Sequence, residues 1–346
     1  MRQSAEFRQG CDDYGQYPSL NRFIRRSTLR TAVLGPGHPH GSGSAGGADP
    51  DGCDRPWARP PAREATVVSG KVADVSPHVI ILHTAAGEQR LTLAPHTRAW
   101  RGAPVQPAAI SEGDHVILRT ARHPQAVERI WAQTGRATGT IVESRGRELI
   151  VDEGPARGRR IVMIENGSFR QIQVRFPRIT PGYLIDVIGL RRPGHLLALT
   201  PATAQPPYLA GHPPTPPLVN GHVPERVSGT AVWHEPGGEP PDLFGVAYPA
   251  LDPETNCEQH GAGPGCVRLP YLSVGSVVGI RNECSGIASV VPVTSCGASS
   301  RLFCDRCVEC GTSPRGRIAD LTMTAFVELG GNLDDGCFNA TLAVPA

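Results

Sequence analysis

The chain has 346 residues, which is long enough for two or three domains that each bury a core of their own. Its formal net charge is only +2, so the charge balance does not predict binding to nucleic acid or to an anionic membrane surface. Glycine (40 residues) and proline (34) are abundant and aromatic residues make up 5%, which favours short strands and frequent turns over long helices. Apolar runs stay well below the about 18 residues that a membrane-spanning helix needs, so we expect no transmembrane segment.

Residues 1–63 are rich in Gly, Pro, Ser and Arg and lack hydrophobic periodicity, which predicts a disordered amino-terminal segment. Within it, residues 24–30 (IRRSTLR) look like a twin-arginine export signal, with paired arginines followed by a hydrophobic and a basic residue. The apolar run that should follow begins at residues 31–34 and stops at Gly35. An export signal and a basic tail therefore both remain open for this stretch.

Cysteines are concentrated at the carboxyl end of the chain. Eight of the ten lie within the last 90 residues, at Cys257, Cys266, Cys284, Cys296, Cys304, Cys307, Cys310 and Cys337. An even number of cysteines in a small domain predicts a disulfide framework, which requires an oxidising compartment. We therefore expect a secreted or envelope-associated protein, exported by the twin-arginine route if residues 24–30 are a signal. The pairing of the cysteines stays open.

Three of these cysteines form a Cys-x-x-Cys-x-x-Cys run, Cys304 to Cys310. Such spacing can hold zinc or an iron–sulfur cluster, but both need thiolates that are kept reduced. Five further cysteines surround the run, so disulfides are the favoured use. We expect no metal and no cofactor, and a metal-binding protein is kept as an alternative.

A repeat organises the middle of the chain. Gly70–Val72 is echoed by Gly139–Ile141, and Ile110–Asp114 is echoed by Ile179–Tyr183, in both cases at an offset of 69 residues. In each copy, short β-branched runs alternate with turn residues. A constant offset over two landmarks predicts two similar small β-barrels, at residues 64–132 and 133–200.

These two barrels resemble the small OB-like barrels of bacterial envelope proteins. An OB-type barrel can bind oligosaccharide or single-stranded nucleic acid, and the latter needs exposed aromatic platforms in a basic groove. Most of the available aromatic residues fall at positions expected to be core: Trp100, Trp131, Phe169, Phe176 and Tyr183. We therefore predict structural or interaction modules and no nucleic-acid partner. The proline-rich residues 201–226 follow as a semi-rigid linker, expected to hold the last domain away from the barrels.

Residues 227–346 contain strand-like runs and one expected helix. From 320 to 330, apolar residues recur at helical spacing and Gly330-Gly331 ends the pattern, with Asp320 or Thr322 as the expected cap. The sequence therefore predicts a second kind of small domain, mainly β with one short helix.

Three segments of this domain are similar to a known family. Tyr271–Val278 looks like the family's entry into a barrel strand, and Val290–Gly297 is similar to its V-x-V-T-D-x-C/G-P strand end. Ala319–Phe326 matches its (I/L)-D-L-S-x-x-A-F block. Over about residues 227–344 the chain thus resembles the double-psi β-barrel of expansins and rare-lipoprotein-A-like proteins. The resemblance implies a six-stranded barrel in an exported protein that acts on peptidoglycan or another wall polysaccharide.

The resemblance also implies site residues. In the family the aspartate that matches Asp320 lies in an open groove and is the essential acid, and a glycosidic bond needs such a group, with a raised pKa, to protonate its leaving oxygen. Ser295 stands where the family has a second aspartate, and Asp305 is a weaker candidate to replace that carboxylate. Trp233, Tyr248 and Tyr271 are candidates for stacking on sugars, against a core role.

Four functions remain open on this basis. The leading hypothesis is binding or non-hydrolytic loosening of wall polysaccharide, since hydrolysis generally uses two carboxylates. A lytic transglycosylase would need only Asp320 as its acid and base. A non-catalytic protein-interaction module and the metal-binding protein complete the set, so whether the protein is an enzyme is undecided.

Overall fold

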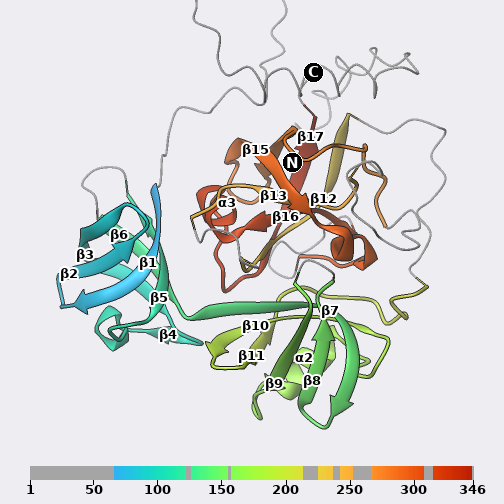
Figure 1. Cartoon of the computed structure of the whole chain (residues 1–346), viewed down its shortest axis with the longest axis horizontal. Coiled ribbons are helices and arrows are strands. Elements are labelled where there is room, and N and C mark those ends of the chain that lie inside the picture. Colours follow the sequence, from blue (N-terminus) through green and yellow to red (C-terminus); the bar gives the residue numbers. More distant parts are fainter. Residues whose placement is uncertain are drawn as a thin grey trace, which may run out of the picture.

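The computed structural model describes residues 66–121, 126–154, 157–212, 225–236, 242–251, 266–307 and 315–344. These residues fold into three small closed β-barrels, which confirms the predicted mainly β architecture (Figure 1). The twin-arginine-like residues 24–30, Cys257, Cys310 and residues 213–224 of the proline-rich linker lie outside the described residues. Among the helices of the described part, none has the length and apolar character to span a membrane.

The first barrel, barrel 1, closes through the strand order β2-β1-β5-β6-β3 and a β2–β3 pairing, with β4 attached to β3. Its core holds Ile80, Leu82 and Leu118, because alternate residues of each strand point inward. The elements are β1 (Thr66–Val75), β2 (Val79–Thr84), β3 (Gly87–Trp100), β4 (Pro104–Val105), the 3-10 turn η1 (Pro107–Ala109), β5 (His115–Thr120) and β6 (Ala126–Ala132).

Barrel 2 repeats this plan. Its closed strand order, β8-β7-β10-β11-β9, matches that of barrel 1 strand for strand, and β6 and β11 lie 69 residues apart. Gly113 and Gly182, one in each copy, turn the chain in the left-handed region at φ 83° and 85°. The elements are β7 (Thr134–Arg145), β8 (Glu148–Asp152), β9 (Arg159–Ile164), α2 (Phe169–Arg175), β10 (Leu184–Arg192) and β11 (His195–Pro201). The predicted tandem pair of similar small barrels is confirmed.

Barrel 3 is a closed six-stranded barrel with the order β12-β16-β13-β15-β14-β17. Two of its strand pairs are parallel, β12–β16 and β13–β15, and the others are antiparallel, so the chain crosses over the barrel ends as a double-psi barrel requires. The elements are β12 (Arg226–His234), β13 (Val246–Tyr248), β14 (Val277–Asn282), β15 (Ala288–Cys296), the 3-10 turn η3 (Ala298–Leu302), β16 (Arg317–Thr322), α3 (Met323–Glu328) and β17 (Cys337–Ala343).

The predicted helix begins later than the sequence pattern indicated. Asp320 lies in strand β16, which pairs with β12 on one side and β13 on the other, and α3 begins only at Met323. Thr322 is the N-cap, because its hydroxyl accepts a hydrogen bond from the N–H of Ala325. The alternative cap, Asp320, is therefore wrong, since its backbone is committed to the sheet.

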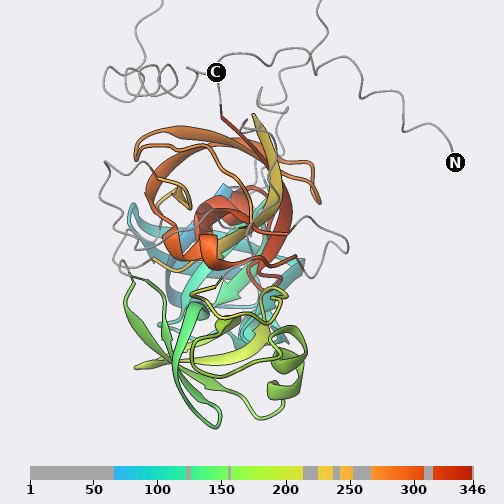
Figure 2. The ribbon, with the colours of Figure 1, turned by 90° about the vertical axis from the view of Figure 1, so that its right-hand side faces the viewer.

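The barrels pack directly on one another, and the expectation of a spacer that keeps them apart is wrong for the described part of the linker. Barrel 3 lies on barrel 2, with barrel 1 beside it (Figures 1 and 2). The barrel 3 core extends to Trp131 of barrel 1 and Ile188 of barrel 2. Tyr208, within the linker, donates a 2.6 Å hydrogen bond to the carbonyl of Leu302 and accepts one from the N–H of Cys304.

Candidate functional site

Asp320 lies on the outer surface of barrel 3, where barrel 2 covers it. Its strand neighbours Ala319 and Leu321 point into the barrel core, so alternation turns Asp320 outward. Its side chain is nevertheless only 2% exposed. The resemblance implied an acid in an open groove, and the structure instead places this carboxylate in an interface.

Three donors surround the Asp320 carboxylate. Arg157 of barrel 2 lies 3.3 Å away, the Nδ1 atom of His234 lies at 3.2 Å, and the Ser300 hydroxyl donates at 3.3 Å. Burial alone would raise the pKa of Asp320, but Arg157, His234 and Arg317 outweigh it and hold that pKa well below its ordinary range. Asp320 is therefore an ionised carboxylate rather than a proton-carrying acid, contrary to the role that the resemblance implied.

Ser295 and Asp320 belong to one row of the sheet. Ala247 of β13 pairs with Asp320 on one side and with Ser295 of β15 on the other. Residues paired in this way point to the same face, and two strand spacings separate them by about 10 Å. Ser295 is partly exposed, so the row runs from the covered Asp320 toward a more open edge.

Asp305 does not supply the second carboxylate at this row. It is fully buried and is bound by the guanidinium of Arg317, with Nε at 2.8 Å. The same guanidinium also binds Asp186 of barrel 2. Asp305 thus belongs to an ion-pair cluster between barrels, and the prediction that it restores groove chemistry is wrong in geometry.

Two of the three aromatic candidates are core residues. Trp233 and Tyr248 are fully buried, and their polar atoms donate to the carbonyls of Leu333 and Pro270. Neither ring can stack on a sugar, because large aromatic side chains with satisfied polar ends complete the inside of this barrel. Tyr271 is 46% exposed and remains accessible.

The described cysteines bear out a disulfide-containing domain. Cys266 and Cys304 form a disulfide that ties the segment before β14 to the loop before β16. Cys284 and Cys296 each take part in a disulfide as well. Cys307 and Cys337 are buried and pack with Val232. Across the described ranges of the chain, no group of three or more His, Cys, Asp or Glu side chains is arranged to hold a metal ion.

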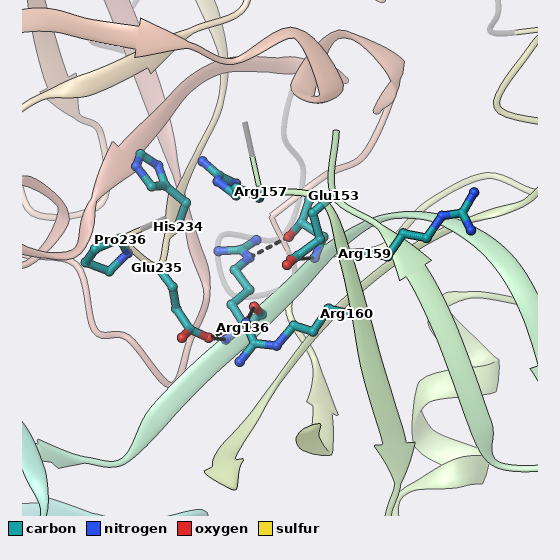
Figure 3. Close-up of a pocket in the computed structure, with 9 residues that line it drawn as sticks. Arg136, Glu153, Arg157, Arg159, Arg160, His234, Glu235 and Pro236 are labelled. Atoms are coloured by element: carbon teal, nitrogen blue, oxygen red, sulfur yellow. Dashed lines mark hydrogen bonds and ion pairs between the residues drawn. The ribbon is translucent and has the colours of Figure 1, made fainter. Parts of the chain in front are cut away.

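A polar pocket of about 240 Å³ opens between barrels 2 and 3 (Figure 3). Arg157, which lines it, is the arginine that binds Asp320. Barrel 2 contributes the start of β7, the β8–β9 connection and the start of β9, and barrel 3 contributes the end of β12 and the residues after it. The lining residues are Arg136, Thr138, Glu153, Arg157, Arg159, Arg160, His234, Glu235 and Pro236.

Glu235 holds the barrel 3 side of the pocket in place. Its carboxylate accepts hydrogen bonds from the backbone N–H of Arg136 at 2.5 Å and from Arg160 at 2.8 Å, and it lies 3.5 Å from Arg191. All three partners come from barrel 2. Glu235 is therefore an anchor between the two barrels.

Glu153 has the opposite electrostatic character. Its Oε1 accepts one hydrogen bond, from the N–H of Thr138 at 3.0 Å. Burial raises the pKa of Glu153 above its ordinary value, against the lowering effects of the Thr138 N–H and of Arg160 and Arg157. The pocket thus combines guanidinium groups with a carboxyl group that is protonated more readily than a free glutamate.

A buried ion-pair cluster lies behind the pocket. Asp186 of β10 accepts two hydrogen bonds from Arg136, at 2.8 and 2.6 Å, and one from Arg317 of barrel 3. Burial raises the pKa of Asp186, but the two arginines outweigh it and bring the pKa down to about 2. This cluster fixes the position of Arg136 and hence the floor of the pocket.

The barrel 2 half of this site was not predicted from the sequence. One signal was present: at the offset of 69 residues, Arg136 and Asp186 replace Val67 and Ile117 of the first copy. A charged pair within strands where the repeat has apolar residues marks a position that contacts something other than a hydrophobic core.

No family model matches the chain, and no curated protein matches it in a sequence search. The site therefore has to be interpreted from its own chemistry.

Proposed function

We propose that this chain is an exported cell-envelope protein that binds wall polysaccharide, in the first place peptidoglycan, without cleaving it. The observation that carries the proposal is the state of Asp320, ionised and enclosed by Arg157, His234 and Ser300. Glycosidic cleavage needs a proton donor at the leaving oxygen, and this carboxylate does not provide one. A polar pocket beside it remains open to a ligand.

Two further features support this proposal. Disulfides such as Cys266–Cys304 are typical of oxidising compartments outside the cytoplasm. Barrels 1 and 2 resemble OB-type barrels, a fold whose members include oligosaccharide binders. An extracytoplasmic protein with three β-barrels and a polar pocket fits a role in holding glycan at the cell envelope.

The test uses the purified full-length protein and isolated peptidoglycan sacculi. We expect the protein to sediment with sacculi and to release no soluble fragments over hours, as followed by chromatography of the supernatant. Asp320→Asn is compared with Asp74→Asn, a substitution at an exposed aspartate of barrel 1.

Two outcomes contradict the proposal in different ways. Release of anhydro-muropeptides that Asp320→Asn abolishes and Asp74→Asn leaves intact would establish a lytic transglycosylase. A wild-type protein that stays in the supernatant would exclude wall binding and leave a protein-interaction module.

A further inference from the structure

Two arginines of the pocket carry donors that the protein does not use. Arg157 contacts Asp320 through one terminal nitrogen, and Arg160 uses one terminal nitrogen for both Glu235 and the Arg136 carbonyl. Their remaining N–H groups have no partner among the described residues. The side chains are 16% and 21% exposed, so these donors are accessible from the pocket. A guanidinium with free donors on one edge is suited to bind a carboxylate or phosphate.

The charge around the pocket leaves room for an anion. Four carboxylates that accept hydrogen bonds from arginines lie in or behind it, at Asp186, Glu235, Asp305 and Asp320. They face five arginines, at Arg136, Arg157, Arg160, Arg191 and Arg317. Arg159 also lines the pocket but points away from the other side chains in Figure 3.

Glu153 is the pocket carboxyl group whose protonation affects the binding of an anion. When it is protonated, its hydroxyl donates a hydrogen bond to an incoming oxygen instead of repelling it. Its residue exposure is only 9%, so it meets a ligand from the inner wall of the pocket. The two guanidinium edges favour a carboxylate ligand, and Glu153, whose pKa is raised by burial, repels that ligand less than an ordinary glutamate would.

The size of the pocket limits the ligand. A cavity of about 240 Å³ is below the range of about 300–1,000 Å³ that is usual for drug-sized ligands. It accommodates one acidic substituent with part of its sugar and excludes a strand of several sugars. The remainder of a polysaccharide would lie outside on the barrel surfaces.

We propose that this pocket binds the carboxylate of an acidic sugar unit, with Arg157 and Arg160 as the recognising groups. The inference rests on the proposed wall-glycan function and names the part of the glycan that is recognised. In peptidoglycan, the lactyl group of N-acetylmuramic acid presents such a carboxylate wherever the stem peptide, which is otherwise amide-linked to it, has been removed.

The test compares two sugars that differ only in the lactyl substituent that carries the carboxylate. N-acetylmuramic acid and N-acetylglucosamine are titrated into the full-length protein and followed by calorimetry, with inorganic phosphate as a third ligand. We expect the acidic sugar to bind at least about tenfold more tightly than the neutral one, the range given by one charge-assisted hydrogen bond. Equal binding of the two sugars would overturn the inference. Phosphate that binds as tightly as the acidic sugar would contradict recognition of the sugar and show a general anion site.

The matched variants are Arg157→Gln and Arg145→Gln. Arg145 is an exposed arginine of the same barrel, at 78% side-chain exposure, so its loss changes the net charge equally without touching the pocket. Arg157→Gln should weaken binding of the acidic sugar about tenfold and Arg145→Gln should leave it unchanged. If both variants weakened binding of the acidic sugar equally, the overall positive charge of the protein rather than the pocket would account for binding.

A third variant separates recognition from folding, because Arg157 also supports Asp320. Glu153→Gln replaces the carboxyl group by a neutral amide of similar shape that can still donate a hydrogen bond, so it should retain or improve binding at neutral pH. Loss of binding in this folded variant contradicts the proposed donor role. Sedimentation with sacculi whose stem peptides have been removed is measured in parallel. Wild-type binding that Arg157→Gln leaves intact would contradict binding through the pocket and would leave the proposed wall binding in place.

Discussion

Asp186 shows how one residue changes the interface of a repeated barrel. Its counterpart in barrel 1, Ile117, belongs to the apolar core that barrel 1 shares with barrel 3. In barrel 2 the same position holds a fully buried carboxylate that needs Arg136 and Arg317 as partners. A buried ion pair of this kind adds little net stability, but removal of one partner is costly because it leaves charges without compensation.

Asp186→Asn should therefore lower the free energy of unfolding by about 3–5 kcal/mol at pH 7. The pKa of Asp186 is about 2 in the folded protein, below the ordinary value of 3.8, so its contribution is complete above pH 4 and is lost as the pH falls toward 2. Denaturant titrations at pH 7 and down to pH 2 measure both effects. The variant should have a flatter pH profile between pH 4 and 2 than the wild type, and parallel profiles would contradict the assigned pairing.

At the scale of elements, α3 depends on the residue that precedes it. The Thr322 hydroxyl accepts hydrogen bonds from the N–H groups of Ala325 and Gly245. It therefore caps the helix and also holds the residue that precedes β13. The sequence pattern located this helix because its apolar residues recur at helical spacing. It missed the start because pairing of β16 on both sides extends the strand as far as Thr322.

Thr322→Ala should lower the free energy of unfolding by about 1–2 kcal/mol, the usual cost of losing an N-cap side chain. Thr322→Ser keeps the hydroxyl and should recover most of this loss. Thermal unfolding of the two variants side by side checks the assignment. If the serine variant were as unstable as the alanine variant, the methyl group rather than the hydrogen bonds would carry the effect.

At the scale of the whole molecule, the two repeated barrels dock on barrel 3 through equivalent strands. Barrel 1 uses the residues around Val67 and Ile117 of β1 and β5, and barrel 2 uses Arg136 and Asp186 of β7 and β10. The duplication thus supplied one docking surface twice, first apolar and then charged. The charged copy covers Asp320 and lines, together with barrel 3, the pocket that holds Arg157 and Arg160.

Asp334 connects barrel 1 to barrel 3 and provides a test of their coupling. Its carboxylate accepts hydrogen bonds from the Trp131 indole at 2.7 Å and from Arg129 at 2.6 Å, and the Arg129 guanidinium also lies over the Trp131 ring. We expect the wild-type protein to unfold in one calorimetric transition. Asp334→Ala should split off a lower transition for barrel 1, and Glu128→Ala, at an exposed partner of Arg119, should not. A single unshifted transition in Asp334→Ala would contradict this coupling.

The sequence by itself determined the mainly β architecture, the tandem barrels, the short helix and the presence of disulfides. These features follow from local periodicity, from turn residues and from a constant repeat offset. All three can be recognised along the chain without knowing how the barrels pack on one another. The surroundings of Asp320 were decided only by the tertiary structure. Alternation along β16 predicts that this carboxylate points out of its own barrel, but it cannot predict that Arg157, from another barrel and far away in sequence, covers and ionises it.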